Sequence, residues 1–169
     1  KINNLPIDNE KNFAATLADK DIKDNFKKIS SDSYVFIGEI SDFSKKNLGA
    51  IANFGFIVGK DCVAIIDTGG SSFVSSELLK KIRDVTENPI CFVINTHAHP
   101  DHIGGNSVFE SLNPKPEFIS HFNFPRALAS RKVVFNKRLK EMMGIKNAIK
   151  TFKISRKVKN TLEIDLGER

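Results

Sequence analysis

Three histidines and an aspartate fall within six residues of the stretch VINTHAHPDHIGGN, residues 93–106. These side chains are His97, His99, Asp101 and His102. Imidazole and carboxylate groups without any thiolate suit Zn²⁺, and iron or manganese can use the same ligands. Two metal ions about 4 Å apart can share a bridging water and lower its pKa towards neutrality, so that hydroxide becomes the nucleophile. The spacing therefore predicts a metal centre with hydrolytic chemistry.

The elements around this cluster predict how it is positioned. The run ICFVINT (residues 90–96) is apolar throughout, which is typical of a strand buried on both faces. His97 follows it directly, at the carboxyl end where ligands gather in open α/β sheets. Two earlier strand-like runs, separated by Gly59-Lys60, precede an amphipathic helix over Ser72–Asn88 that Ser71 or Ser72 can cap. The order strand, helix, strand predicts a right-handed crossover between parallel neighbours.

Other segments complete the predicted domain of residues 32–169. Residues 1–31 are polar and are interpreted as an extended lead-in segment. The polar loop Ser41–Ala50 offers few groups to anchor it, so we expect it to be mobile. Further elements are predicted as a strand at 33–40, a short helix near 105–112, a strand at 117–121, a long helix over Pro125–Met143 and an alternating strand at 160–169.

The composition is that of a globular domain. The chain has 169 residues, of which 40% are hydrophobic and 27% charged, and no apolar run is long enough to cross a bilayer. It begins at Lys1, so we expect that a tag or signal peptide has been removed. Cys62 and Cys91 lie in apolar runs and are interpreted as buried hydrophobic residues, with a disulfide between neighbouring strands as the alternative.

The net charge of +6 is spread unevenly along the chain. Between Arg131 and Lys159 there are eleven Lys or Arg residues and one acid, Glu141, so this segment carries +10 and the remainder −4. A patch of this kind can attract nucleic acid or anionic substrates. Because aromatic residues do not alternate regularly with the charges as in nucleic-acid sites, we expect a solvated helical face and no nucleic-acid partner.

A family resemblance rests on two motifs. The stretch THAHPDHIGG resembles the His-x-His-x-Asp-His signature of the metallo-β-lactamase superfamily, and CVAIIDTGG resembles its strand that ends in a structural aspartate, here Asp67. The stretches GAIANFGFIVG and INTHAHPDHIGGN are most similar to the quinoprotein-relay-type zinc metallohydrolases, which are periplasmic. The resemblance covers roughly residues 34 to 167.

The resemblance implies roles for individual residues. His97 and His99 match two ligands of a first zinc ion, and Asp101 and His102 match ligands of a second. Asp101 is also placed to orient the nucleophilic water. Asp67 matches the carboxylate that fixes the ligand loop, a role with physical sense because ligating imidazoles need their other N–H held. The alternative is a turn residue at the end of the strand. The one other histidine of the chain, His121, is not at a family ligand position, and we expect it to have a structural polar role.

The resemblance also implies the fold and its extent. The family fold is an αββα sandwich, and we expect this chain to hold its N-terminal half, a mixed sheet with helices on one face. A third histidine, a bridging aspartate and a last histidine would follow the stretch NTLEIDLGER. The site is therefore expected to be incomplete, with weak or absent zinc binding and negligible activity in the chain as given. The uncovered sheet face is expected to pair with a second copy or with the missing half.

The function expected from the resemblance is that of a periplasmic zinc-dependent hydrolase acting on a small-molecule substrate through zinc-bound hydroxide. β-Lactams, thioesters, sulfur compounds and phosphodiesters are all substrates within the superfamily, and the fold does not choose among them. Two alternatives stay open. One is a non-catalytic binding or assembly module with the same fold, and the other is a nucleic-acid-processing member that uses the basic patch at 131–159.

Overall fold

The computed structural model describes residues 22, 25–144, 149–150 and 152–167. Seven strands form one sheet whose spatial order follows the sequence. The strands are β1 (Phe26–Lys28), β2 (Ser33–Phe36), β3 (Phe54–Val58), β4 (Val63–Ile66), β5 (Ile90–Asn95), β6 (Glu117–His121) and β7 (Arg156–Val158). The helices are α2 (Ser72–Val85), α3 (Pro100–Ile103), α4 (Asn106–Glu110) and α5 (Phe124–Met143).

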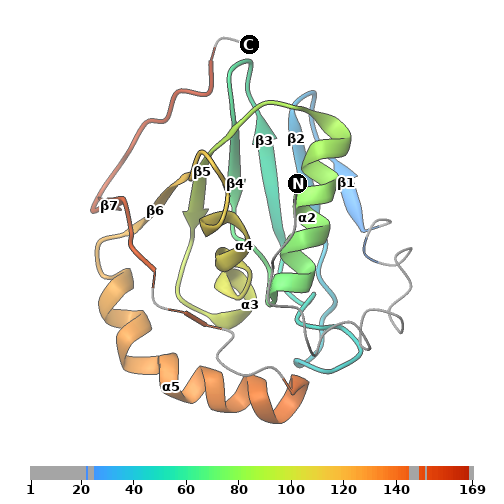
Figure 1. Ribbon diagram of the computed structural model, residues 1–169, viewed down its shortest axis with the longest axis vertical. Helices are drawn as coiled ribbons and strands as arrows, with labels where there is room; N and C mark the ends of the chain where they lie inside the picture. The colour runs from blue at the N-terminus through green and yellow to red at the C-terminus, as the bar shows by residue number, and fades with distance from the viewer. Residues whose placement is uncertain (1–21, 23–24, 145–148, 151, 168–169) are drawn as a thin grey trace.

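The sheet is mixed, with an antiparallel half and a parallel half. Neighbours from β1 to β4 pair antiparallel, and neighbours from β4 to β7 pair parallel. The β3–β4 hairpin closes where the Gly59 N–H donates to the carbonyl of Cys62 at 2.9 Å. The crossover from β4 through α2 to β5 is the predicted parallel unit (Figure 1). The α/β class with a mixed sheet is confirmed.

The helices pack on one face of the sheet and build the main core there. Ser71 caps α2 by accepting a hydrogen bond from the Val74 N–H at 3.3 Å, as one of the two predicted caps. Three α2 side chains spaced by one turn (Val74, Leu78 and Ile82) are completely buried. They join strand residues and parts of α3, α4 and α5 in one apolar cluster. The predicted helical stripe therefore faces the sheet.

The apolar cluster on the opposite face of the sheet is smaller, and the C-terminal segment partly covers it. The cluster is formed by Cys62, Ala64, Phe92 and Ile119. Ile164 and Leu166 pack on this cluster, and the Leu166 carbonyl accepts from Asp61 N at 3.0 Å and Cys62 N at 3.4 Å. The prediction of a strand at 160–169 is wrong for the described part, because residues 160–167 cross the face without a regular ladder. The face is thus not fully bare, and pairing with a second copy stays a prediction.

Two further segments differ from the sequence-based expectations. β1 lies inside the range interpreted as a lead-in segment, where Phe26 packs edge-on against Phe36 with ring centroids 5.3 Å apart. Most of residues 1–31 lies outside the described residues, so the domain boundary stays a prediction.

The loop at 41–50 is anchored, contrary to the expectation that few groups could hold it. Asn47 is 8% exposed, and its Oδ1 accepts from the backbone N–H groups of Ser44 and Gly49, both at 3.0 Å. Its Nδ2 donates to Ser41 Oγ at 3.1 Å and to the Asp42 carbonyl at 2.8 Å. One buried amide thus organises the loop, and the argument for its mobility was wrong.

Within the described ranges, no helix is both long and apolar enough to span a membrane. Both cysteines are free thiols, Cys62 buried and Cys91 half-buried. Burial raises the pKa of the Cys62 thiol to about 12, and the hydrogen bond with Cys91 and the nearby charges of Asp61 and Asp165 act in the same direction.

We predict that iodoacetamide at pH 8 labels Cys91 well before Cys62 in the folded protein. The reactive form is the thiolate, and a thiol with so high a pKa is almost fully protonated at this pH. Peptide mass spectrometry over a time course measures both rates, and labelling in denaturant, where both should react alike, is the control. Equal rates in the folded protein would contradict the described burial.

Candidate metal centre

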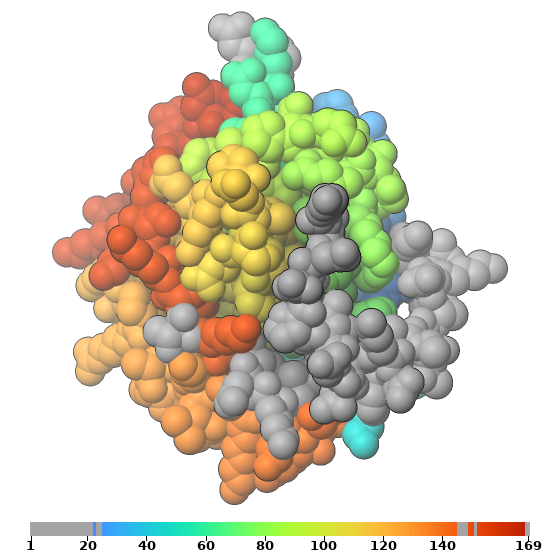
Figure 2. All heavy atoms as spheres, in the orientation of Figure 1, coloured from blue at the N-terminus to red at the C-terminus, as the bar shows by residue number. Residues whose placement is uncertain are grey.

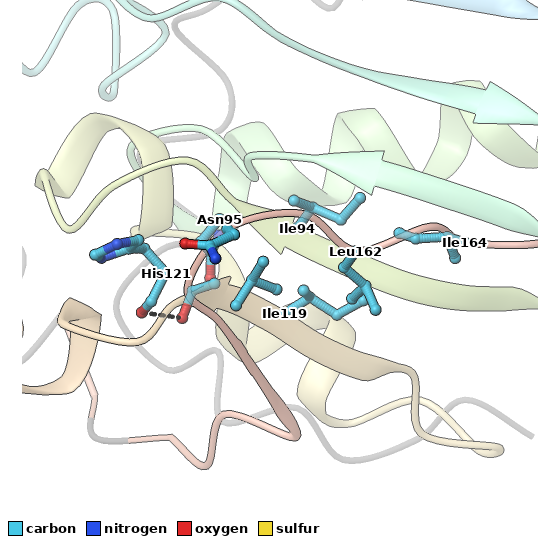
Figure 3. A pocket seen from close by; sticks show the side chains of 9 residues that line it. Ile94, Asn95, Ile119, His121, Leu162 and Ile164 are labelled. Atoms are coloured by element: carbon cyan, nitrogen blue, oxygen red, sulfur yellow. Dashed lines mark hydrogen bonds between the residues drawn. The ribbon is translucent and has the colours of Figure 1, made fainter.

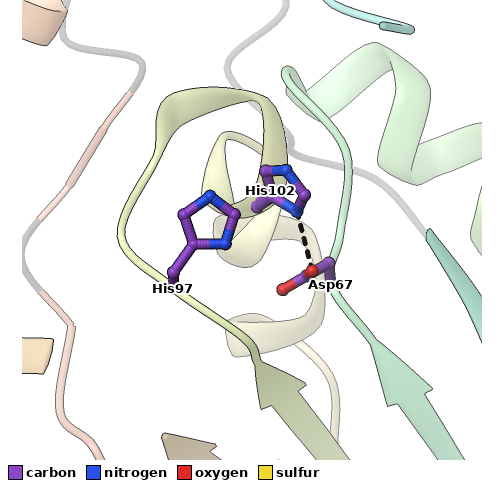
Figure 4. Close-up of side chains that lie close together, drawn as sticks. All are labelled: Asp67, His97 and His102. Atoms are coloured by element: carbon purple, nitrogen blue, oxygen red, sulfur yellow. Dashed lines mark hydrogen bonds and ion pairs between the residues drawn. The ribbon is translucent and has the colours of Figure 1, made fainter. Parts of the chain in front are cut away.

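The predicted site residues lie together beyond the carboxyl ends of β4 and β5. Asp67 follows β4, His97 follows β5, and α3 carries Asp101 and His102 (Figure 4). Pro100 occupies the first turn of α3, where its missing N–H removes no helical hydrogen bond. Because β4 and β5 are parallel neighbours, their ends bring Asp67 next to the histidine loop.

The carboxylate of Asp67 is the centre of the hydrogen-bond network. Its Oδ1 accepts from the Thr96 N–H at 2.8 Å, and its Oδ2 accepts from Thr96 Oγ1 at 2.6 Å. The same Oδ2 lies 2.7 Å from Nδ1 of His102. The Asp67 side chain is only 3% exposed. Its backbone has φ of 56°, a left-handed conformation that aspartate tolerates better than most residues.

This arrangement fixes the orientation of His102. Since a carboxylate oxygen at 2.7 Å accepts a hydrogen bond, we assign the hydrogen to Nδ1. The lone pair is then on Nε2, which lies 3.5 Å from Asp101 Oδ2. A ligating histidine commonly has its second N–H held by a carboxylate in this way. Asp67 therefore has the geometry expected from the resemblance.

His97 and His99 complete the cluster. The ring centroid of His97 lies 4.1 Å from that of His102 and 4.6 Å from that of His99. Nδ1 of His97 is 3.0 Å from Thr96 Oγ1, which leaves its Nε2 free for a ligand. His99 meets the ring of Phe135 on α5 edge-on, with centroids 6.0 Å apart. The four predicted ligand residues are thus neighbours, although His99 and Asp101 are outside the set whose ligand atoms converge most closely.

Among the described residues, the tightest potential ligand set is Asp67, His97 and His102, whose ligand atoms lie within 4.8 Å of one another. Both oxygens of Asp67 already accept hydrogen bonds from Thr96 or His102. Coordination by Asp67 would displace these bonds, so we assign it to orient His102 and not to bind the metal. His97, His99, Asp101 and His102 offer the N and O donors that suit zinc.

The pKa shifts of His97 and His102 favour metal binding by these two residues. Burial lowers the pKa of His97, and the neighbouring imidazoles of His102 and His99 lower it further. His97 therefore offers a neutral ring, the form that binds metal. For His102, burial acts to lower the pKa, but the hydrogen bond and charge of Asp67, with the charge of Asp101, outweigh it and raise the pKa. A metal at Nε2 would take the place of that added proton.

A buried polar network behind the site was not predicted. Thr68 donates from N to the His102 carbonyl at 2.8 Å and from Oγ1 to Asn106 Oδ1 at 2.8 Å. Asn106 and Asn95 also join their side-chain amides, with Nδ2 of Asn106 donating to Oδ1 of Asn95 at 2.8 Å. Thr96, which touches both Asp67 and His97, was missed as well. Its hydroxyl directly before His97 was the one local signal that could have identified it.

Two glycines after the histidines, Gly104 and Gly105, are required for packing. A Cβ on Gly105 would lie 1.4 Å from Ser75 Oγ, and one on Gly104 would lie 2.3 Å from the Gly70 carbonyl oxygen. The absence of these side chains lets the chain after α3 pass directly over the start of α2.

His121 does not join the cluster. Its Nδ1 accepts from the Asn123 N–H at 3.3 Å, and its ring lies 4.8 Å from that of Phe122. It lines an open groove of about 280 Å³ with Ile94, Ile119 and residues of the C-terminal segment (Figure 3). This placement agrees with the structural polar role expected for it.

We predict that Asp67→Asn lowers the zinc affinity of the full-length protein by about 10- to 100-fold, the usual effect of losing a carboxylate behind a ligating histidine. The amide keeps the size of the side chain but not the charge or both acceptors. Competition with a chromophoric chelator measures the affinity. Asp84→Asn, at the opposite end of α2, is the matched control. Wild-type affinity in a well-folded Asp67→Asn protein would contradict the assignment.

Comparison with known proteins agrees with this fold. Residues 49–169 match the family model described as the metallo-beta-lactamase superfamily. A linear primary-alkylsulfatase of Pseudomonas sp. (strain ATCC 19151) is 43% identical over 47 residues, which are 28% of this chain and 9% of the relative.

Two solved structures show a similar fold. A metallo-beta-lactamase from Pontibacter korlensis gives a TM-score of 0.53 at 19% identity, and one from Hirschia baltica gives 0.51 at 20%. Each likeness covers 63% of this chain and 47% of the other, so the chain matches less than half the length of these proteins. With the family match extending over most of its residues, the chain belongs to the metallo-beta-lactamase superfamily.

Proposed function

We propose that the full-length protein is a zinc-dependent hydrolase, with His97, His99, Asp101 and His102 as metal ligands. The observation that carries this proposal is the orientation of His102, whose Nδ1 is held by Asp67 while Nε2 faces Asp101. The Asp67 carboxylate behind the His102 ring is only 3% exposed. A buried carboxylate in this position is typical of a metal-ligating histidine and is not required in a surface cluster of histidines that binds no metal. When bound, zinc lowers the pKa of a coordinated water and so supplies the nucleophile.

The residues of this chain orient the reacting groups. Asp101 is 24% exposed, so one of its oxygens can reach water in the site while the carboxylate stays near His102. In this role it accepts a hydrogen bond from the attacking water and directs the oxygen lone pair towards the substrate. His97 and His99 hold the other side of the cluster, where their rings stand at 69° to one another.

The substrate class is proposed from chemistry that the superfamily shares. A small ester, thioester, lactam or sulfate ester has a centre that a water nucleophile attacks. The sequence likeness to a linear primary-alkylsulfatase makes sulfate esters the first class to test, although it covers only 47 residues. A periplasmic location belongs to the same proposal and rests on the resemblance alone.

We predict that the full-length protein loses hydrolysis of its best substrate when zinc is removed with a chelator and regains it when zinc is restored. A panel of ester, thioester, lactam and sulfate ester substrates identifies that substrate. Asp101→Ala at saturating zinc should lower kcat by about 10²- to 10⁴-fold, the range for loss of a positioned acid–base group. Glu110→Gln removes a half-buried carboxylate paired with Lys115 and is the control. Wild-type turnover by Asp101→Ala would show that another group orients the water.

A further inference from the structure

We propose that Arg131 on α5 binds an anionic group of the substrate, next to the histidine cluster. This inference deepens the proposed function and rests on it, because it names the charge of the molecule that enters the site. The group recognised is an oxyanion such as a sulfate, sulfonate, phosphate or carboxylate. The position of α5 in the fold is the first observation that supports this site.

The helix α5 touches the site through one aromatic ring. Phe135 meets His99 with ring planes at 86° and centroids 6.0 Å apart. Figure 1 shows α5 passing beneath α3, and Figure 2 shows its atoms exposed along the lower edge of the molecule. Any substrate held at His99 therefore lies close to the middle of α5.

Two arginines flank Phe135 on the same stripe of the helix. Residues three and four positions apart on a helix are surface neighbours, with Cβ atoms roughly 5–6 Å apart. Arg131 precedes Phe135 by four positions and Arg138 follows it by three. Both arginines are exposed. A long arginine side chain at either position can therefore extend beside His99.

Of the two arginines, Arg138 already has partners. Its Nη2 lies 3.2 Å from Asp42 Oδ1, and its Nε lies 3.3 Å from Met142 Sδ. For Arg131, no ion pair is formed within the part of the chain that the structure describes. Arg131 is thus the guanidinium of this stripe that is available to a ligand.

The charge of the surrounding helix favours an anion. Six residues of α5 are basic and one, Glu141, is acidic. A guanidinium presents parallel N–H groups that match two oxygens of an oxyanion. A diffuse positive charge attracts an anion but does not provide this match. The outward face of the helix carries Val133 and Val134, exposed by 80% and 65%, so its positive charge is interrupted. The arrangement therefore favours a small anionic ligand at Arg131 over a polyanion lying along α5.

The test measures binding without turnover. Octane-1-sulfonate is the anionic probe, because its carbon–sulfur bond resists hydrolysis, and octan-1-ol is the neutral probe of equal chain length. Calorimetric titrations use the full-length protein, both zinc-loaded and chelator-treated, so that binding to zinc is separated from binding to the arginine. Arg126→Ala is the control, since Arg126 is exposed on α5 but about 140° around the helix from Arg131.

Arg131→Ala should weaken sulfonate binding about tenfold in both zinc states, the usual scale for one charge-assisted hydrogen-bonded contact, and leave octanol binding unchanged. Arg131→Lys, which keeps the charge but not the fork, should fall between Ala and wild type. Arg126→Ala should bind both probes as wild type does.

Three results would overturn the proposal. They are wild-type sulfonate affinity in Arg131→Ala, equal losses in Arg126→Ala and Arg131→Ala, and wild-type binding of the sulfonate no tighter than of octanol. Equal losses would indicate a diffuse basic surface of the kind that attracts nucleic acid. Sulfonate binding that depends on Arg131 in a protein without zinc-dependent turnover would support the anion site and reject the proposed hydrolase, so the two can fail separately.

Discussion

The carboxylate of Asp67 is the constraint on which the site depends. It accepts hydrogen bonds from the backbone and side chain of Thr96, and it holds Nδ1 of His102. Asp67 also donates from its own N–H to the Ile94 carbonyl at 2.9 Å, which continues the β4–β5 ladder beyond β4. One residue thereby joins the two strand ends and sets the direction of the His102 ring in the candidate metal centre. A buried carboxylate at this position is stable only because these donors surround it.

The same region shows how packing of the sheet and helices reaches the chemistry. Thr68 follows Asp67 and binds the His102 carbonyl, so the end of β4 holds both the ring and the backbone of that histidine. Gly105 packs against Ser75 of α2 with no room for a Cβ. A change in the α2 crossover would therefore shift α3 and with it Asp101 and His102. The position of the candidate metal centre therefore depends on the packing of the fold.

Much of the architecture was predictable because it depends on local patterns. The apolar run before His97, the helical stripe of α2 and the spacing of the four ligand residues each lie within a few turns of chain. The sequence-based predictions that were wrong concern features that depend on contacts between distant segments or on a single side chain. Asn47 anchors its loop through hydrogen bonds with four neighbouring residues, which no hydrophobic period reveals. Residues 160–167 alternate like a strand but cross the sheet face. Within the described ranges, Leu166 is the one residue of this segment whose carbonyl accepts backbone hydrogen bonds from the β3–β4 hairpin.

The central claim is that Asp67 holds Nδ1 of His102 so that Nε2 becomes the ligand. Nitrogen-15 NMR of the histidine rings in the full-length protein, with ¹¹³Cd²⁺ in place of zinc, tests it directly, because the coupling identifies the nitrogen bonded to the metal. The account predicts a protonated Nδ1 and a cadmium coupling at Nε2 of His102, with Nε2 of His97 also coupled. Coupling at Nδ1 of His102, or no coupling to this residue at saturating cadmium, would contradict it.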